Sequence, residues 1–94
     1  MAIIHNEKSL EMLYRTLAAF DDPQDIKDLL FDLCTTREVE EIAQRLQVAR
    51  MLDQGMSYLS IQEETGASAA TVARVSKFLN KGAGGYRKAL DKEL

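Results

Sequence analysis

Apolar residues recur every three to four positions along most of the chain, the spacing of amphipathic α-helices, and no stretch alternates as a half-buried strand does. The first predicted helix runs from Glu7 to Phe20, with an apolar stripe at Leu10, Leu13, Tyr14, Leu17 and Phe20. Asp22 before Pro23 predicts the start of a second helix, because proline is tolerated where the first helical N–H has no partner. That helix presents Ile26, Leu29, Leu30 and Leu33.

Start and stop signals divide the rest of the chain. The segment from Thr35 to Glu38 has the Thr-x-x-Glu form of a capping box and predicts a longer helix to about Gln54, ended by Gly55. Its apolar seam consists of Val39, Ile42, Leu46, Ala49 and Leu52. The glycine-rich residues 82–85 predict a flexible break before a last short helix from Tyr86 to about Glu93. With the hairpin described next, the pattern predicts an all-α chain of six helices.

Residues 56–79 have the spacing of two short helices joined by a tight turn, as in a helix-turn-helix. Ser57 and Ser68 can each cap a helix, because a short hydroxyl accepts a hydrogen bond from a free N–H of the first turn. Gly66 lies between them, where a left-handed backbone favours glycine. The inward positions of such a hairpin are Ile61, Thr65, Ala67, Val72 and Val75.

The second hairpin helix is left with small side chains on its outer face, so it can approach base edges in the DNA major groove. Ala69, Ala70 and Thr71 are the candidates for base edges, and Arg74, Ser76 and Lys77 for positions nearer the backbone. Ser57 and Ser68, at the two helix starts, complete the candidate DNA-binding set. The alternative is a helical hairpin that only packs in a bundle, since a glycine between two capped helices is common.

The distribution of charge along the chain favours DNA binding, although the net charge does not. The chain carries −3 overall, which suits a nucleic-acid binder poorly. Residues 1–64 hold 6 Lys and Arg against 13 Asp and Glu, whereas residues 65–90 hold Arg74, Lys77, Lys81, Arg87 and Lys88 and no acid. The helix proposed to meet DNA therefore lies in the basic stretch.

Composition predicts one folded domain over residues 1–94, because 46% hydrophobic and 29% charged residues are typical of a globular chain. A chain this small buries a modest core, so a second copy of itself would help to stabilise it. We expect a cytoplasmic location, since the N-terminus lacks the basic and apolar regions of a signal peptide and no segment is long enough to span a membrane. The single cysteine, Cys34, agrees with a reducing compartment and is expected to be a small buried hydrophobe.

Candidate chemistry is sparse. His5 stands alone with no second ligand at metal spacing, so neither a metal nor another cofactor is expected. Glu38, Glu40 and Glu41 suit a helix N-terminus, where negative charge is favourable. The acids from Asp21 to Asp28 are expected to form a solvated face. Because no nucleophile–base pair or phosphate loop is present, the sequence does not predict an enzyme.

Laid out in this way, the sequence resembles the Trp repressor family, and more closely its small Trp-repressor-like bacterial branch of unassigned role. The resemblance runs from Leu29 to the C-terminus and is carried by Leu29-Leu30, Thr35, the Arg45 region, Gly55-Met56-Ser57, Gly66-Ala67 and Ala70-Thr71-Val72-Ala73-Arg74. It implies an intertwined homodimer in which the N-terminal helices, about residues 1–34, pack against the other subunit. Two recognition helices would then lie one DNA turn apart.

The resemblance also implies a ligand pocket at Thr35, Arg45 and Arg74, where the family holds its indole corepressor between two arginines. Two positions depart from that pattern, because Val75 replaces a glycine and Phe78 replaces a serine. A valine side chain takes space that the ligand would need, and a phenyl group removes a hydroxyl that could bind an ammonium group. We therefore expect these side chains to close the cavity and tryptophan not to be a ligand. Arg45 and Arg74 could hold another anionic effector, or serve Glu38, Glu41 or DNA phosphates.

The first hairpin helix departs from the family in a second way. It offers Tyr58, Leu59 and Gln62, with acids at Glu63 and Glu64, where the family places side chains against phosphates. Fewer cations mean weaker and less salt-sensitive DNA binding. Tyr58 and Leu59 could form a protein-contact patch, or Leu59 could pack against the last helix.

Two functions from different classes follow from the sequence. One is a sequence-specific, homodimeric regulator of transcription that binds double-stranded DNA. The other is a protein-interaction adaptor on the same fold with weak or no DNA binding. The sequence does not define the operator, the target genes, or whether regulation is activation or repression.

Overall fold

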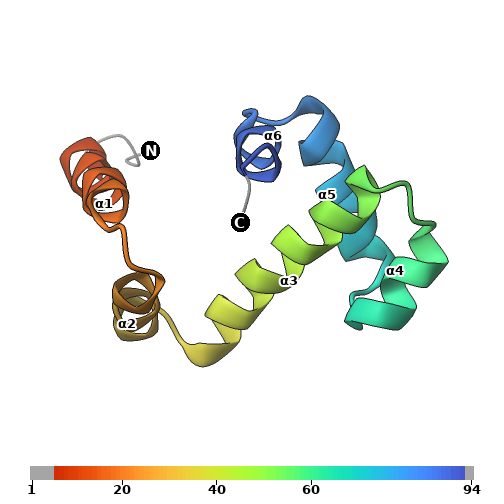
Figure 1. The fold of residues 1–94 in the computed structure, drawn as a ribbon, viewed down its shortest axis with the longest axis horizontal. Coiled ribbons are helices and arrows are strands. Elements are labelled where there is room, and N and C mark those ends of the chain that lie inside the picture. Colours follow the sequence, from red (N-terminus) through yellow and green to blue (C-terminus); the bar gives the residue numbers. More distant parts are fainter. Residues whose placement is uncertain (1–5, 93–94) are drawn as a thin grey trace. The chain divides into compact units, whose positions relative to one another are not determined.

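The computed structural model describes residues 6–92, and these form six α-helices and no strand. The helices are α1 (Glu7–Ala19), α2 (Pro23–Leu33), α3 (Thr36–Asp53), α4 (Tyr58–Thr65), α5 (Ala69–Lys81) and α6 (Gly85–Leu90), labelled in Figure 1. The chain divides into two compact units, Met1–Thr36 and Arg37–Leu94. The all-α prediction is confirmed, and His5 lies outside the described residues.

The N-terminal unit consists of α1 and α2. The Asp22 carboxylate accepts a hydrogen bond from the Gln24 N–H at 2.9 Å, so α2 begins at Pro23 as predicted. α1 ends at Ala19, one residue earlier than predicted, because Phe20 already has extended backbone angles. Neither helix contains a buried residue, and Tyr14 in the apolar stripe of α1 is 58% exposed. The apolar stripes of this unit are therefore only partly covered.

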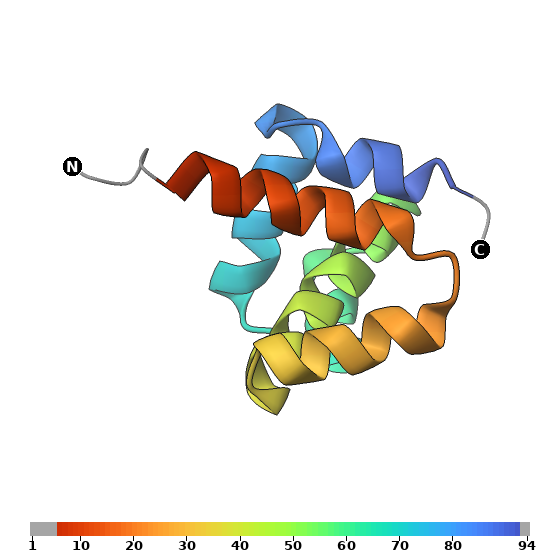
Figure 2. The ribbon, with the colours of Figure 1, turned by 90° about the vertical axis from the view of Figure 1, so that its left-hand side faces the viewer.

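The C-terminal unit holds the core. Six buried residues come from α3, α4, the hairpin turn and α5, namely Val48, Ala49, Ile61, Ala67, Val72 and Val75. Tyr86 and Leu90 of α6 pack against this cluster. α6 follows α5 after a glycine-rich turn and contacts it, which can be followed in Figure 2. The four inward hairpin positions predicted to be apolar are all buried, and Thr65 is partly buried.

The predicted seam of α3 is only partly buried. Ala49 is in the core, but Ile42 is 46% and Leu46 is 39% exposed. Val48, which the predicted seam omits, is fully buried. Periodicity locates an apolar face but does not say which part of it is covered by the rest of the chain. The N-terminal half of α3 therefore keeps an exposed apolar surface.

Two boundaries near the C-terminus also differ from the prediction. α5 continues to Lys81, because the N–H of Gly82 still donates to the Phe78 carbonyl at 2.9 Å. α6 begins at Gly85, after Gly84 in the left-handed region at φ +90°, and ends at Leu90. Across the described residues, no helix is long and apolar enough to cross a membrane.

Candidate nucleic-acid interface

The turn between α4 and α5 is built around Gly66. Its backbone is left-handed, at φ +76°, and its N–H donates to the Gln62 carbonyl at 2.9 Å. The hydroxyl of Thr65 accepts the N–H of Ala67 at 3.1 Å, while the Gln44 side-chain amide donates to the Thr65 carbonyl at 3.1 Å. These bonds define the angle between the two helices and tie the turn to α3.

Both predicted helix caps are present. The Ser57 hydroxyl accepts the N–H of Ser60, and the Ser68 hydroxyl accepts the N–H of Thr71, each at 3.1 Å. Each serine also donates its single hydroxyl proton to the residue it caps, at 3.0 Å for Ser60 and 3.1 Å for Thr71. Both serines are therefore engaged in capping, and a phosphate contact by either hydroxyl would require an exchange of this bond. Thr71 keeps its own hydroxyl proton and its methyl group for an external contact.

One face of α5 is buried in the core and the other is exposed. Val72 and Val75 are buried, with Val75 only 2% exposed, and they fix the helix against the core. The predicted DNA-binding residues of this helix lie on the remaining surface. Ala69, Ala70, Arg74 and Lys77 are exposed, and Thr71 and Ser76 are partly exposed. The structure thus brings together six of the eight predicted residues on one helix.

An aromatic ring accompanies two of the cations of α5. The guanidinium carbon of Arg74 lies 5.1 Å from the centre of the Phe78 ring, and the ammonium nitrogen of Lys77 lies 5.9 Å from it. Sequence reasoning missed these contacts, although an arginine four residues before an aromatic residue on a helix is the spacing that permits one of them. Phe78 is itself 41% exposed.

The outer face of α4 is apolar and acidic. Leu59 is 67% exposed, Tyr58 is also exposed, and Glu63 and Glu64 are exposed on the same short helix. The alternative in which Leu59 packs against the last helix is therefore wrong. An eight-residue helix buries only the side that meets the core, here through Ile61.

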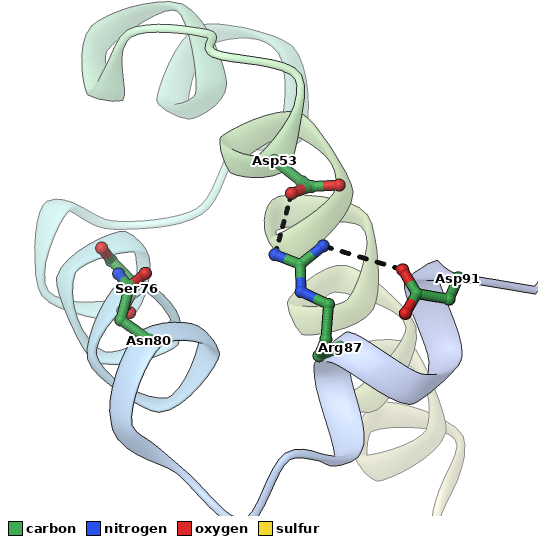
Figure 3. A network of polar contacts seen from close by, with 5 residues as sticks. All are labelled: Asp53, Ser76, Asn80, Arg87 and Asp91. Carbon is green, nitrogen blue, oxygen red and sulfur yellow. Dashed lines mark hydrogen bonds and ion pairs between the residues drawn. The ribbon is translucent and has the colours of Figure 1, made fainter.

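One cation of the basic stretch is used within the fold. The guanidinium of Arg87 on α6 donates to the Asp53 carboxylate at the end of α3, at 2.9 Å, and lies 3.9 Å from Asp91 (Figure 3). The hydrogen bond from Arg87 is the main cause that lowers the pKa of Asp53; desolvation opposes it, and the charges of Arg87 and Arg50 add to the lowering. The same hydrogen bond raises the pKa of Arg87. No local sequence signal predicts a pair so far apart in the chain.

A hollow of about 310 Å³ lies beside α5, lined by Arg45, Arg74, Val75, Phe78 and Tyr86. It includes two of the three residues predicted for a ligand pocket, whereas Thr35 belongs to the N-terminal unit and directly precedes α3. Val75 and Phe78 both line this hollow, and their closure of the corepressor cavity stays a prediction. The Phe78 ring lies 5.1 Å from the guanidinium carbon of Arg74, and both residues line the hollow.

Other candidate chemistry remains structural. Among residues 6–92, no group of histidine, cysteine or acidic side chains is placed to hold a metal ion. Asp28 accepts a hydrogen bond from the Gln24 side chain at 2.8 Å, and Asp22 caps α2, so two of the clustered acids serve the helix that carries them. Cys34, expected to be buried, is partly exposed at the end of α2.

Comparisons with known proteins agree with this architecture. Residues 8–94 match the family described as Trp repressor protein. The chain is 44% identical over 85 residues to the uncharacterized protein YerC of Bacillus subtilis (strain 168), covering 90% of this chain and 82% of that protein. A crystal structure of a TrpR-like protein from Eubacterium eligens ATCC 27750 superposes with a TM-score of 0.86 at 37% identity, covering 89% of this chain and 87% of that one.

A candidate Trp repressor from Staphylococcus aureus gives a similar result. Its crystal structure superposes with a TM-score of 0.87 at 36% identity and covers 97% of this chain and 92% of its own. The predicted resemblance and the predicted all-α Trp-repressor-like fold of one chain are thereby confirmed, and the intertwined homodimer stays a prediction. By the extent of the match and the identity of these relatives, the chain belongs to the Trp repressor protein family.

Proposed function

We propose that this protein is a sequence-specific DNA-binding regulator of transcription that acts as a homodimer. Membership in a regulator family supports DNA binding and gives no indication of catalysis. The observation that carries the proposal is the outer face of α5, which presents small side chains at its N-terminal end and Arg74 and Lys77 one turn further on.

The shape of that face suits the major groove. Ala69 and Ala70 leave the backbone of the first turn open to close approach, and their methyl groups can contact thymine methyls. Thr71 offers a hydroxyl donor to a base edge, while Arg74, Ser76 and Lys77 are placed for the backbone. Residues 56–79 would then act as the helix-turn-helix, with α5 as the recognition helix.

Dimerisation is supported by the apolar surface that one copy leaves exposed. Leu10, Met12 and Tyr14 on α1 and Phe31 and Leu33 on α2 are exposed large hydrophobic residues, and so are Ile42 and Leu46 on α3. A soluble monomer rarely exposes so many apolar side chains. We assign residues 1–34 to the dimer interface, so that two α5 helices would face one DNA duplex and read a pseudo-palindromic site in the cytoplasm of a bacterial cell.

We further propose that tryptophan is not the effector. Val75 occupies a buried position beside the hollow and Phe78 offers no hydroxyl for an ammonium group. The hollow is large enough for a small ligand, so exclusion rests on its chemistry and not on its volume. Calorimetry with tryptophan at micromolar to millimolar concentrations should give no saturable binding, and a saturable isotherm at micromolar concentrations would overturn this part of the proposal.

A protein-interaction adaptor is the second candidate function, and one observation favours it. Tyr58 and Leu59 form an exposed apolar pair beside Glu63 and Glu64, on the helix that would lie nearest the DNA backbone. Acidic side chains there oppose phosphate contact, and an aromatic and an aliphatic side chain together are typical anchors of protein interfaces.

Titration of fluorescent random duplex DNA at about 50, 100 and 150 mM salt separates the two functions. A regulator binds at about 150 mM salt, and Lys77→Gln lowers its affinity evenly across sequences. The same variant reduces the slope of log affinity against log salt by about one for each phosphate that Lys77 neutralises. Lys92→Gln, the same change at an exposed lysine beyond α6, is the control and should leave both quantities unchanged. Absence of wild-type binding at every salt concentration would favour the adaptor.

A further inference from the structure

The ring of Phe78 is an apolar group on a charged surface. It is 41% exposed on the helix proposed to read DNA. Its neighbours in space are the charged groups of Arg74 and Lys77, at 5.1 Å and 5.9 Å from the ring centre. Arg74 and Lys77 are the two cations of α5 that are proposed to contact the DNA backbone, and both are exposed.

We propose that Phe78 is a positioning residue for DNA recognition, whose ring holds the cationic groups of Arg74 and Lys77 in place before DNA arrives. This inference rests on the proposed DNA-binding function and adds a residue that does not itself need to touch the duplex.

The physical basis is the electrostatic attraction between a cation and the negative face of an aromatic ring. Both distances fall within the range of about 6 Å in which this attraction acts. Neither Arg74 nor Lys77 has an ion-pair partner among the described residues. The ring therefore supplies a contact for cations that would otherwise be free to rotate in solvent.

Contact with the ring leaves the hydrogen-bond donors of Arg74 available for DNA. The hydrogen-bond donors of a guanidinium lie in its plane and point outward, so a contact through its face leaves them available for a phosphate or a guanine edge. Long cationic side chains lose much rotamer freedom when they bind. A ring that already restricts Arg74 and Lys77 lowers this entropic cost at the moment of DNA binding.

Phe78 also lines the hollow that contains Tyr86 of α6, so its removal could act by loosening the fold. Two variants separate the two roles. Phe78→Leu removes the ring but keeps an apolar side chain that is compatible with a helix. Phe78→Tyr keeps the ring. Each is made in the wild-type background and in the Arg74→Gln/Lys77→Gln background, and all proteins are compared by duplex titration at fixed salt.

We expect Phe78→Leu to weaken binding about threefold for each recognition helix, which is about tenfold for a dimer on its site. Phe78→Tyr should bind duplex DNA with wild-type affinity, because it keeps the ring. In the Arg74→Gln/Lys77→Gln background, Phe78→Leu should have no further effect, because the ring then has no cation to hold. A purely structural role would instead weaken binding equally in both backgrounds, and that result would overturn the proposal.

NMR provides a readout that does not depend on DNA. The side-chain protons of Arg74 and Lys77 should show ring-current shifts in the wild type and in Phe78→Tyr, and these shifts should disappear in Phe78→Leu. Wild-type shifts without any binding of duplex DNA would mean that the proposed function fails while the ring still holds the cations. Wild-type DNA binding with unchanged affinity in Phe78→Leu would mean that the positioning role alone is wrong.

Discussion

The two units of the chain use similar amphipathic helices but bury them to very different extents. In Arg37–Leu94, side chains from three helices and one turn meet in a core that includes Val48, Ile61 and Val72, all fully buried. In Met1–Thr36, neither α1 nor α2 contributes a buried residue, although both have a clear apolar stripe. Apolar spacing therefore specifies a helix in both units, whereas burial also needs neighbouring helices that cover the stripe, as α3, α4 and α5 do for one another in the C-terminal unit.

The largest effect is expected in the core of the C-terminal unit. Ile61→Ala should lower the free energy of unfolding by about 2–5 kcal/mol, because it removes a fully buried side chain and leaves a cavity. Leu59→Ala on the same helix is the matched control and should change stability by less than about 0.5 kcal/mol, since that side chain is exposed. Denaturant unfolding at one fixed protein concentration measures both. Equal losses of stability would contradict the assignment of the core.

The N-terminal unit should respond through association. Tyr14→Glu places a charge in the exposed apolar stripe of α1 and should raise the dimer dissociation constant by about 100-fold, because the carboxylate would have to be desolvated in the interface. Gln54→Glu adds the same charge at an exposed position of the C-terminal unit, outside residues 1–34, and should leave the constant unchanged. Sedimentation equilibrium measures both. A wild-type protein that is monomeric at micromolar concentration would contradict the proposed interface.

A smaller effect is expected at the turn that joins α4 to α5. Gly66→Ala should cost about 1–2 kcal/mol, because a side chain is strained at φ +76°. Gly85→Ala offers a control at the start of α6, where φ is not left-handed and an added methyl meets nothing within 4 Å. There alanine should be neutral or slightly stabilising. A thermal unfolding series that finds the two variants alike would show that the turn tolerates another backbone conformation.

The smallest effect is expected at the exposed pair between Asp53 and Arg87. The lowered pKa of Asp53 means that its stabilising contribution is present above the unfolded pKa and is lost as pH falls through the folded pKa. Asp53→Asn should therefore be slightly less stable than wild type at pH 7, and the difference should disappear in strongly acidic solution. Melting temperatures from neutral pH to below about pH 3 test this. A difference that persists at low pH would point to a cause other than this ion pair.

Local features of the fold were predictable because they depend on neighbours in sequence. The caps at Ser57 and Ser68, the left-handed Gly66 and the start of α2 after Asp22 all formed as expected. The extent of burial along α3 was not predictable, because it depends on where α4 and α5 cross that helix. The ion pair between Asp53 and Arg87 was missed for the same reason.

The candidate site was partly predictable. The inward valines of α5 and the exposure of Arg74 and Lys77 follow from helical spacing and were anticipated. The ring contacts of Phe78 were missed, because the resemblance drew attention to the absent hydroxyl at that position and not to the cations beside it. Sequence comparison marks a departure from a pattern, whereas geometry shows which interaction replaces it.

The central claim is that the C-terminal unit reads DNA while the N-terminal unit pairs two copies of the chain. Selection of random duplex DNA by the purified protein at about 150 mM salt, followed by sequencing, tests both parts at once. The account predicts enrichment of a two-fold symmetric site with half-sites about one helical turn apart, and a changed half-site sequence when the selection is repeated with Thr71→Ala. No enrichment by a folded, dimeric protein would contradict it and favour a protein partner.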